Sequence, residues 1–147
     1  MQNQHLSIVF PVKGATLQAF DSINKVTAWW TENLVGESAG LNDEFVVQFG
    51  DVHFSRQKIV EMIPGKKVVW LITESRLNFV ADKQEWTGTR IIFEVLEENG
   101  QTMIRFTHEG LVPQVECYDA CSGAWSQYMG SLQQLINTGR GEPALRS

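Results

Sequence analysis

The chain has 147 residues, of which 43% are hydrophobic and 20% are charged. This length fits one ordinary domain, and the composition excludes collagen-like, coiled-coil and generally disordered proteins. The formal net charge is −5 and basic residues cluster only at the Lys66-Lys67 pair, so we expect no nucleic-acid partner.

No apolar run approaches the roughly 18 residues needed to cross a bilayer, and residues 1–5 have neither a basic nor an apolar signal stretch. We therefore expect no membrane span and a cytoplasmic location. No repeat, low-complexity tract or linker divides the sequence, which predicts a single domain over residues 1–147.

The N-terminal part predicts a strand followed by a helix. Apolar residues alternate with polar ones over residues 5–12, as in a half-buried strand. From Ala15 onward, Leu17, Phe20 and Ile23 recur at spacings of three, which predicts one apolar stripe on a helix.

Period-two patterns predict antiparallel strands in the middle of the chain. The expected strands cover residues 44–48, 52–62, 67–73, 89–96 and 102–108. A tight turn at Gly50-Asp51 and a hairpin loop at residues 97–101 join neighbouring strands. Residues 74–87 have weak periodicity, and we interpret them as a loop or an irregular edge strand.

A long amphipathic helix is predicted near the C-terminus. Its apolar positions recur at steps of three and four: Tyr118, Cys121, Trp125, Tyr128, Leu132 and Leu135. Gly139 is placed to cap this helix and Pro143 to prevent its continuation.

The order of elements predicts an α+β fold in which a sheet of about six antiparallel strands and the C-terminal helix bury each other's apolar faces. We expect the helix to lie across the concave face of the sheet. Large inward-facing side chains then either fill the interior or line a cavity, and the sequence leaves both alternatives open. These side chains are Phe45, Phe49, Trp70, Phe93, Phe106 and Trp125.

Several short motifs together resemble a known superfamily. They are Trp29-Trp30, residues 45–50, residues 61–64 before Val68-Val69-Trp70, residues 85–89, residues 106–111, and Gly123-Ala124-Trp125 with Ser131-Leu132. In these motifs the chain resembles the START-like (SRPBCC, Bet v 1-like) superfamily. It is most similar to the branch of the activator of heat shock protein 90 ATPase homologues.

The resemblance implies a helix-grip fold, a curved antiparallel sheet wrapped around a long C-terminal helix, usually with an apolar cavity. It does not imply one activity, because the superfamily contains lipid carriers, hormone receptors, cyclases, hydroxylase domains and a co-chaperone domain. The eukaryotic co-chaperone has a separate N-terminal domain, whereas this chain begins with the first START-like strand. This difference argues against direct chaperone activation.

No motif of a metalloprotease, nucleophile elbow, phosphate loop or dinucleotide site is present, so we expect no catalytic residues and no cofactor. Cys117 and Cys121 are one helical turn apart, and His108 is a conceivable third zinc ligand. The alternative is that both cysteines are small core residues. We favour this second interpretation and expect reduced thiols without a metal.

The leading hypothesis is binding of a hydrophobic or amphipathic small molecule between the sheet and the C-terminal helix, without catalysis. The expected ligand-binding residues are Trp30, Phe49, Trp70, Phe93, Phe106, His108 and Trp125. The aromatic residues would form apolar walls and His108 a polar anchor. The more frequent role for such a histidine is structural, through a hydrogen bond that fixes the turn into the last helix.

Two other classes of function stay open. One is a protein-interaction module that binds a chaperone or another protein, and a homodimer is compatible with the sequence. The other is a cyclase-like or hydrolase-like enzyme that uses His108 with a nearby carboxylate. Trp86 is a further candidate for ligand contact near an opening. Three charged residues could hold a polar head group but are expected in solvent, and these are Glu85, Arg56 and Arg105.

Overall fold

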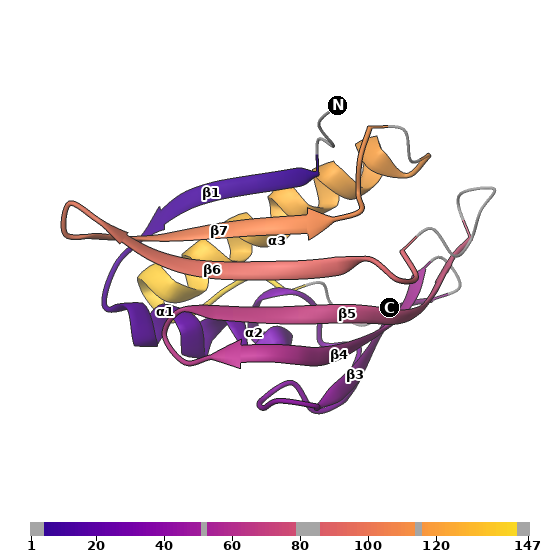
Figure 1. The fold of residues 1–147 in the computed structure, drawn as a ribbon, viewed down its shortest axis with the longest axis horizontal. Coiled ribbons are helices and arrows are strands. Elements are labelled where there is room, and N and C mark those ends of the chain that lie inside the picture. Colours follow the sequence, from indigo (N-terminus) through magenta and orange to yellow (C-terminus); the bar gives the residue numbers. More distant parts are fainter. Residues whose placement is uncertain (1–4, 51–52, 79–85, 114–115, 144–147) are drawn as a thin grey trace.

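Seven strands form one antiparallel sheet that curves around a long C-terminal helix in the computed structural model of the chain (Figure 1). The structure describes residues 5–50, 53–78, 86–113 and 116–143. The strands are β1 (Leu6–Val12), β2 (Leu34–Gly36), β3 (Glu44–Phe49), β4 (His53–Ile63), β5 (Lys67–Leu77), β6 (Arg90–Glu98) and β7 (Gln101–Glu109). The helices are α1 (Thr16–Ile23), α2 (Val26–Trp29) and α3 (Tyr118–Thr138).

The strand order across the sheet is β1-β7-β6-β5-β4-β3-β2, so the first strand pairs with the last. All three helices lie on one face of the sheet, and α3 runs along it behind β7 and β6 in the view of Figure 1. The expected α+β fold, with the helix across the concave face of the sheet, is confirmed.

Local sequence accounts for two of the sharp reversals. Asn99 and Gly100 join β6 to β7 with φ values of 54° and 79°, the left-handed pair that a two-residue hairpin turn of right-handed twist requires. Gly139 ends α3 with φ of 88°, and its N–H donates to Leu135 O over 2.8 Å. This left-handed cap is the one expected from the sequence.

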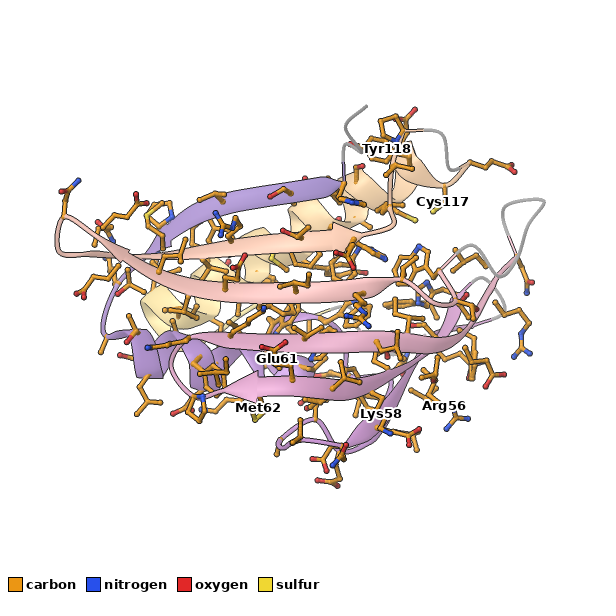
Figure 2. The ribbon with its side chains drawn as sticks, in the orientation of Figure 1. Arg56, Lys58, Glu61, Met62, Cys117 and Tyr118 are labelled. Carbon is orange, nitrogen blue, oxygen red and sulfur yellow. The ribbon has the colours of Figure 1, made fainter. Side chains whose placement is uncertain are left out.

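The period-two pattern decides which strand face is buried. On β7 the inward residues Thr102, Ile104, Phe106 and His108 are all buried, as predicted. Outward residues of the sheet face water, as the side chains of Arg56 and Lys58 on β4 do (Figure 2). One face of the sheet is therefore free to pack against the helices.

Aromatic rings pack against one another in the space between the sheet and the helices. The indoles of Trp29, Trp30 and Trp70 stack, with centroids 5.9 to 6.3 Å apart and interplanar angles of at most 18°. Phe93 meets Trp70 edge to face at 5.0 Å. Each such contact stabilises the fold by about 0.5–1.5 kcal/mol beyond the burial of its area.

The structure corrects four local expectations. Leu17 is 54% exposed, because the buried face of α1 is formed by Ala19, Phe20, Ser22 and Ile23 instead. The short elements α2 and β2 were not predicted, and β5 continues to Leu77. Asp51 of the expected tight turn and residues 79–85 of the expected loop lie outside the described residues.

Candidate functional site

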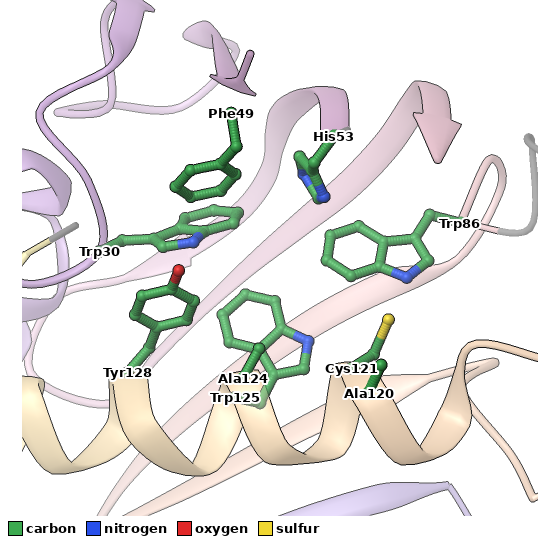
Figure 3. A pocket seen from close by; sticks show the side chains of 9 residues that line it. All are labelled: Trp30, Phe49, His53, Trp86, Ala120, Cys121, Ala124, Trp125 and Tyr128. Atoms are coloured by element: carbon green, nitrogen blue, oxygen red, sulfur yellow. The ribbon is translucent and has the colours of Figure 1, made fainter. Parts of the chain in front are cut away.

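A cavity of about 170 Å³ lies between the open end of the sheet and the N-terminal half of α3. Its described lining residues are Trp30, Phe49, His53, Trp86, Ala120, Cys121, Ala124, Trp125 and Tyr128 (Figure 3). Most of these side chains are aromatic or aliphatic. None of these residues is an Asp, Glu, Lys or Arg.

Two small residues of α3 leave room for this cavity. Ala120 and Ala124 are one turn apart on the face that Tyr128 continues, and they face the rings of Phe49 and His53 across the gap (Figure 3). Farther along α3, Met129, Leu132 and Ile136 are buried in the core. The C-terminal half of α3 therefore packs into the core, whereas in its N-terminal half Ala120 and Ala124 are exposed and border the cavity.

The structure divides the seven residues expected to bind a ligand into three groups. Trp30, Phe49 and Trp125 line the cavity. Trp70, Phe93 and Phe106 are each 0% exposed and pack behind these walls as core. His108, also 0% exposed, touches two of the walls from behind. The inward aromatic residues therefore both fill the interior and line a cavity.

His108 holds two cavity walls through a chain of hydrogen bonds. Trp125 Nε1 donates to His108 Nδ1 over 3.1 Å, and Thr89 Oγ1 donates to Trp86 O over 2.6 Å. The 2.9 Å contact between His108 Nε2 and Thr89 Oγ1 is therefore a bond that the imidazole N–H donates. The hydrogen bonds thus run in series from Trp125 through His108 and Thr89 to the backbone of Trp86.

This chain fixes His108 as a neutral imidazole. Burial, with a smaller electrostatic contribution from His5, lowers the pKa of His108 to about 3. Both ring nitrogens are engaged within the protein, so neither has a lone pair or a proton to exchange with a bound molecule. His108 therefore acts here by holding Trp125 and Trp86 in position.

The imidazole that does line the cavity belongs to His53, at the start of β4. Its ring meets Trp86 edge to face at 4.8 Å and Phe49 at 5.3 Å. Burial among these rings lowers the pKa of His53 to about 4, so the side chain is neutral at pH 7.

His53 was not among the residues predicted from the sequence to bind a ligand. Its Nε2 is 2.9 Å from Ser55 Oγ, to which Gln57 Nε2 donates over 2.5 Å. Ser55 and Gln57 are each 0% exposed. The signal was the run of polar residues at positions 53, 55 and 57, in phase with the buried Ile59, because inward polar residues on a strand need a partner or a function.

The two cysteines lie together at the start of α3. Figure 2 labels Cys117 at this end of the helix. Cys121 Sγ is 2.7 Å from Cys117 Sγ, both side chains are buried, and Cys121 borders the cavity. Within the described ranges, no three His, Cys, Asp or Glu side chains are grouped closely enough to hold a metal ion.

Of the remaining charged candidates, Arg56 and Arg105 lie on the outer face of the sheet. Arg105 Nε is 2.9 Å from Glu94 Oε1, which lowers the pKa of Glu94, and the expectation that Arg105 lies outside is confirmed. Arg56 pairs with Glu74 at 3.5 Å. Glu85 is outside the described residues. Of the helices in the described ranges, none is long and apolar enough to cross a membrane.

Comparison with known proteins gives structural matches only. No protein-family model matches the chain, and neither does any curated protein. The Aha1 dimer from Colwellia psychrerythraea aligns with a TM-score of 0.75 and 20% identity, over 94% of this chain and 99% of that chain. A protein from Staphylococcus saprophyticus aligns with a TM-score of 0.71 and 11% identity, over 97% of this chain and 98% of that chain.

A third match is DynU16, from the dynemicin biosynthetic locus, with a TM-score of 0.67 and 13% identity. The alignment covers 99% of this chain and 52% of DynU16, so this chain spans about half the length of that protein. At these identities the matches establish the fold. They confirm the helix-grip fold that the resemblance to the Aha1-like branch of the START-like superfamily implied.

Proposed function

We propose that this helix-grip domain binds a small hydrophobic or amphipathic molecule in the cavity between the sheet and α3. The observation that carries the proposal is the cavity itself, about 170 Å³ of space bounded by five aromatic side chains and His53. An apolar pocket with a few polar groups at its edge is the usual form of a ligand site. Trp30, Phe49 and Trp125 would serve as wall contacts.

The size of the cavity sets the scale of the ligand. An engineered cavity of about 150 Å³ in another protein accommodates benzene. The space here therefore suits a molecule of one or two rings, and a long acyl chain would have to extend through the mouth. Trp70, Phe93 and Phe106 would support the walls from behind without touching the ligand.

The proposal is tested by titrating ¹⁵N-labelled protein with cumene, a neutral one-ring hydrocarbon, and following amide and indole N–H shifts. We expect saturable shifts in residues around the cavity. Ala124→Leu places a larger side chain in the cavity and should abolish them. Ser126→Leu adds the same side chain to an exposed position of α3 outside the lining and should leave them unchanged. Equal binding by both variants would contradict the proposal.

Association with another protein is the second proposal, and a second copy of this chain is its simplest form. The Colwellia psychrerythraea protein of the same fold is a dimer. In this chain β2 ends the sheet, and Val35 on it is 75% exposed. An apolar strand at a sheet edge can pair with another strand. Light scattering on the eluting protein gives the mass, and a monomer at all concentrations would exclude self-association. Binding of a chaperone would need a separate pull-down.

A further inference from the structure

Cys117 and Cys121 are the two cysteines of the chain, four residues apart in the sequence. In a regular helix the Cβ atoms of residues with this spacing are about 5–6 Å from each other. A disulfide needs a Cβ separation of about 3.5–4.5 Å. A pair of cysteines four apart inside a regular helix therefore cannot form a disulfide unless the backbone changes.

The turn that contains Cys117 departs from regular helical geometry. Cys117 is the N-cap of α3, with φ of −79° and ψ of 1°, whereas ψ in a helix is about −42°. Its carbonyl oxygen accepts the N–H of Cys121 over 2.7 Å, so the turn between the two cysteines is closed.

In this turn Cys117 Sγ and Cys121 Sγ are 2.7 Å apart. Carbon atoms pack without a bond at about 3.5–4.0 Å, and sulfur is the larger atom. The bond length in a disulfide is about 2.05 Å. The two sulfur atoms are thus closer than an ordinary packing contact, and a small movement of the side chains would bring them to bonding distance.

The cavity gives a small oxidant access to one of the two thiols. Cys121 lines the cavity, and Figure 3 shows its sulfur pointing from α3 toward Trp86. Ala120 and Ala124 also line the cavity and are exposed, so this side of the cavity reaches the protein surface. Cys117 is 1% exposed and is not among the described lining residues. An oxidant in the cavity therefore meets Cys121 first.

From this geometry we propose that Cys117 and Cys121 form a redox-active pair, which a peroxide oxidises to a reversible disulfide. The thiolate of Cys121 attacks one oxygen of hydrogen peroxide, the O–O bond breaks and hydroxide leaves, so that Cys121 becomes a sulfenic acid. Cys117 then attacks the sulfenic sulfur and displaces its hydroxyl group. The two sulfurs lose two electrons in total, and peroxide with the two thiol protons becomes two molecules of water.

The position of Cys117 suits the second step. A second thiol beside an accessible one is typical of redox-sensing sites, because it converts the sulfenic acid to a disulfide before further oxidation. The reduced pair that the sequence predicts is the resting state of this site. The proposal uses the cavity only as a path for peroxide and does not depend on the binding of a ligand.

Counting thiols tests the proposal. Reduced protein is treated with hydrogen peroxide in native buffer, and the excess is removed with catalase. The protein is then unfolded in guanidinium chloride with N-ethylmaleimide, and the labels are counted by intact mass. We expect two labels on untreated protein and none on treated protein, with both restored by dithiothreitol before labelling. The far-UV circular dichroism of the oxidised protein should match that of the reduced protein.

Two serine variants test the order of the steps. Cys117→Ser keeps a good N-cap residue and removes the second thiol, so Cys121 should stay a sulfenic acid that dimedone traps. Cys121→Ser retains only the thiol outside the described lining and should give severalfold less dimedone adduct at the same dose of peroxide. Equal trapping in both variants would overturn Cys121 as the residue attacked first.

Three results on the wild-type protein would overturn the pair itself. They are two labels after treatment, a linked dimer in place of the bond within one chain, and loss of the circular dichroism signal on oxidation. The last result would mean that the bond forms only in the unfolded chain. The cumene titration uses reduced protein, so its failure would contradict the proposed binding function and leave the thiol count unaffected.

Discussion

The indole of Trp125 on α3 donates its N–H to Nδ1 of His108 on β7, over 3.1 Å in the buried interior. This bond ties the C-terminal helix to the sheet at one wall of the cavity. Because His108 donates in turn to Thr89, whose hydroxyl donates to the backbone of Trp86, one imidazole positions two walls.

Removal of His108 should therefore destabilise the fold and uncouple Trp125. We expect His108→Leu to lower the free energy of unfolding by about 2–3 kcal/mol, because the indole N–H loses its acceptor in a buried site. Urea denaturation measures this loss. Thr107→Ala, its half-buried neighbour on the other side of β7, is the matched control and should cost less.

A double-mutant cycle tests the bond itself. In a Trp125→Phe background no indole N–H requires an acceptor, so His108→Leu should cost at least about 1 kcal/mol less than in the wild type. Additive effects of the two substitutions would show that His108 and Trp125 act independently.

Stability should fall as the pH is lowered from 7 to 5.5. The folded-state pKa values of His53 and His108, about 4 and about 3, lie below the ordinary value of 6.5. The unfolded chain therefore binds more protons between these limits, and stability is lost as the pH falls through 6.5 toward the folded values. Each histidine contributes up to about 1.4 kcal/mol per pH unit below 6.5.

Urea unfolding at several values between pH 7 and 5.5 measures this slope. Arg105 lowers the pKa of Glu94, so that paired carboxylate titrates below the range. His53→Phe keeps an aromatic ring at the cavity and should reduce the slope. A wild-type stability that is constant over this range would contradict the assignment of both histidines as neutral in the folded protein.

Neighbouring residues on β7 should differ sharply in their contribution to stability. Phe106 is 0% exposed and contacts Phe93 and Trp125, so Phe106→Ala should cost about 3–5 kcal/mol. Arg105 points outward to Glu94, and a surface pair of this kind contributes at most about 1 kcal/mol. Thermal or urea denaturation of Phe106→Ala and Arg105→Ala would detect the contrast. Similar losses would show that the inner and outer faces of β7 are misassigned.

Purified protein should carry no stoichiometric zinc. Cys117 and Cys121 offer two thiols at the start of α3, but both nitrogens of His108 are engaged by Trp125 and Thr89. A structural zinc site needs four ligands. Elemental analysis of untagged protein measures the metal, and one zinc per chain would contradict this prediction.

Sequence periodicity predicts the buried faces best where a strand is long and regular. The faces of β6 and β7 followed from alternation, and the buried face of α3 from steps of three and four. Periodicity was less informative on β4, because the pairing of β4 with β5 shifts after Arg56 and after Ile59. The three-residue β2 and four-residue α2 are too short to show a period.

The cavity depends on the distance between the helix and the sheet, which the periodicity of one sequence segment does not predict. Phe49 and Trp125 were expected at the site from their size and inward phase, and Trp30 from its place near an opening. The same size and phase also indicated Trp70, Phe93 and Phe106, which fill the core. What separates the two groups is the pair of small residues Ala120 and Ala124, which leave a gap opposite β3 and β4. Whether a small residue opens a gap depends on the spacing between helix and sheet, which tertiary packing determines.

The most direct test of the central claim is the structure of crystals grown with cumene. We predict one molecule in the cavity, in contact with Trp30, Phe49 and Trp125. Well-ordered cavity walls with no cumene between them, under conditions that saturate the protein in solution, would contradict the claim.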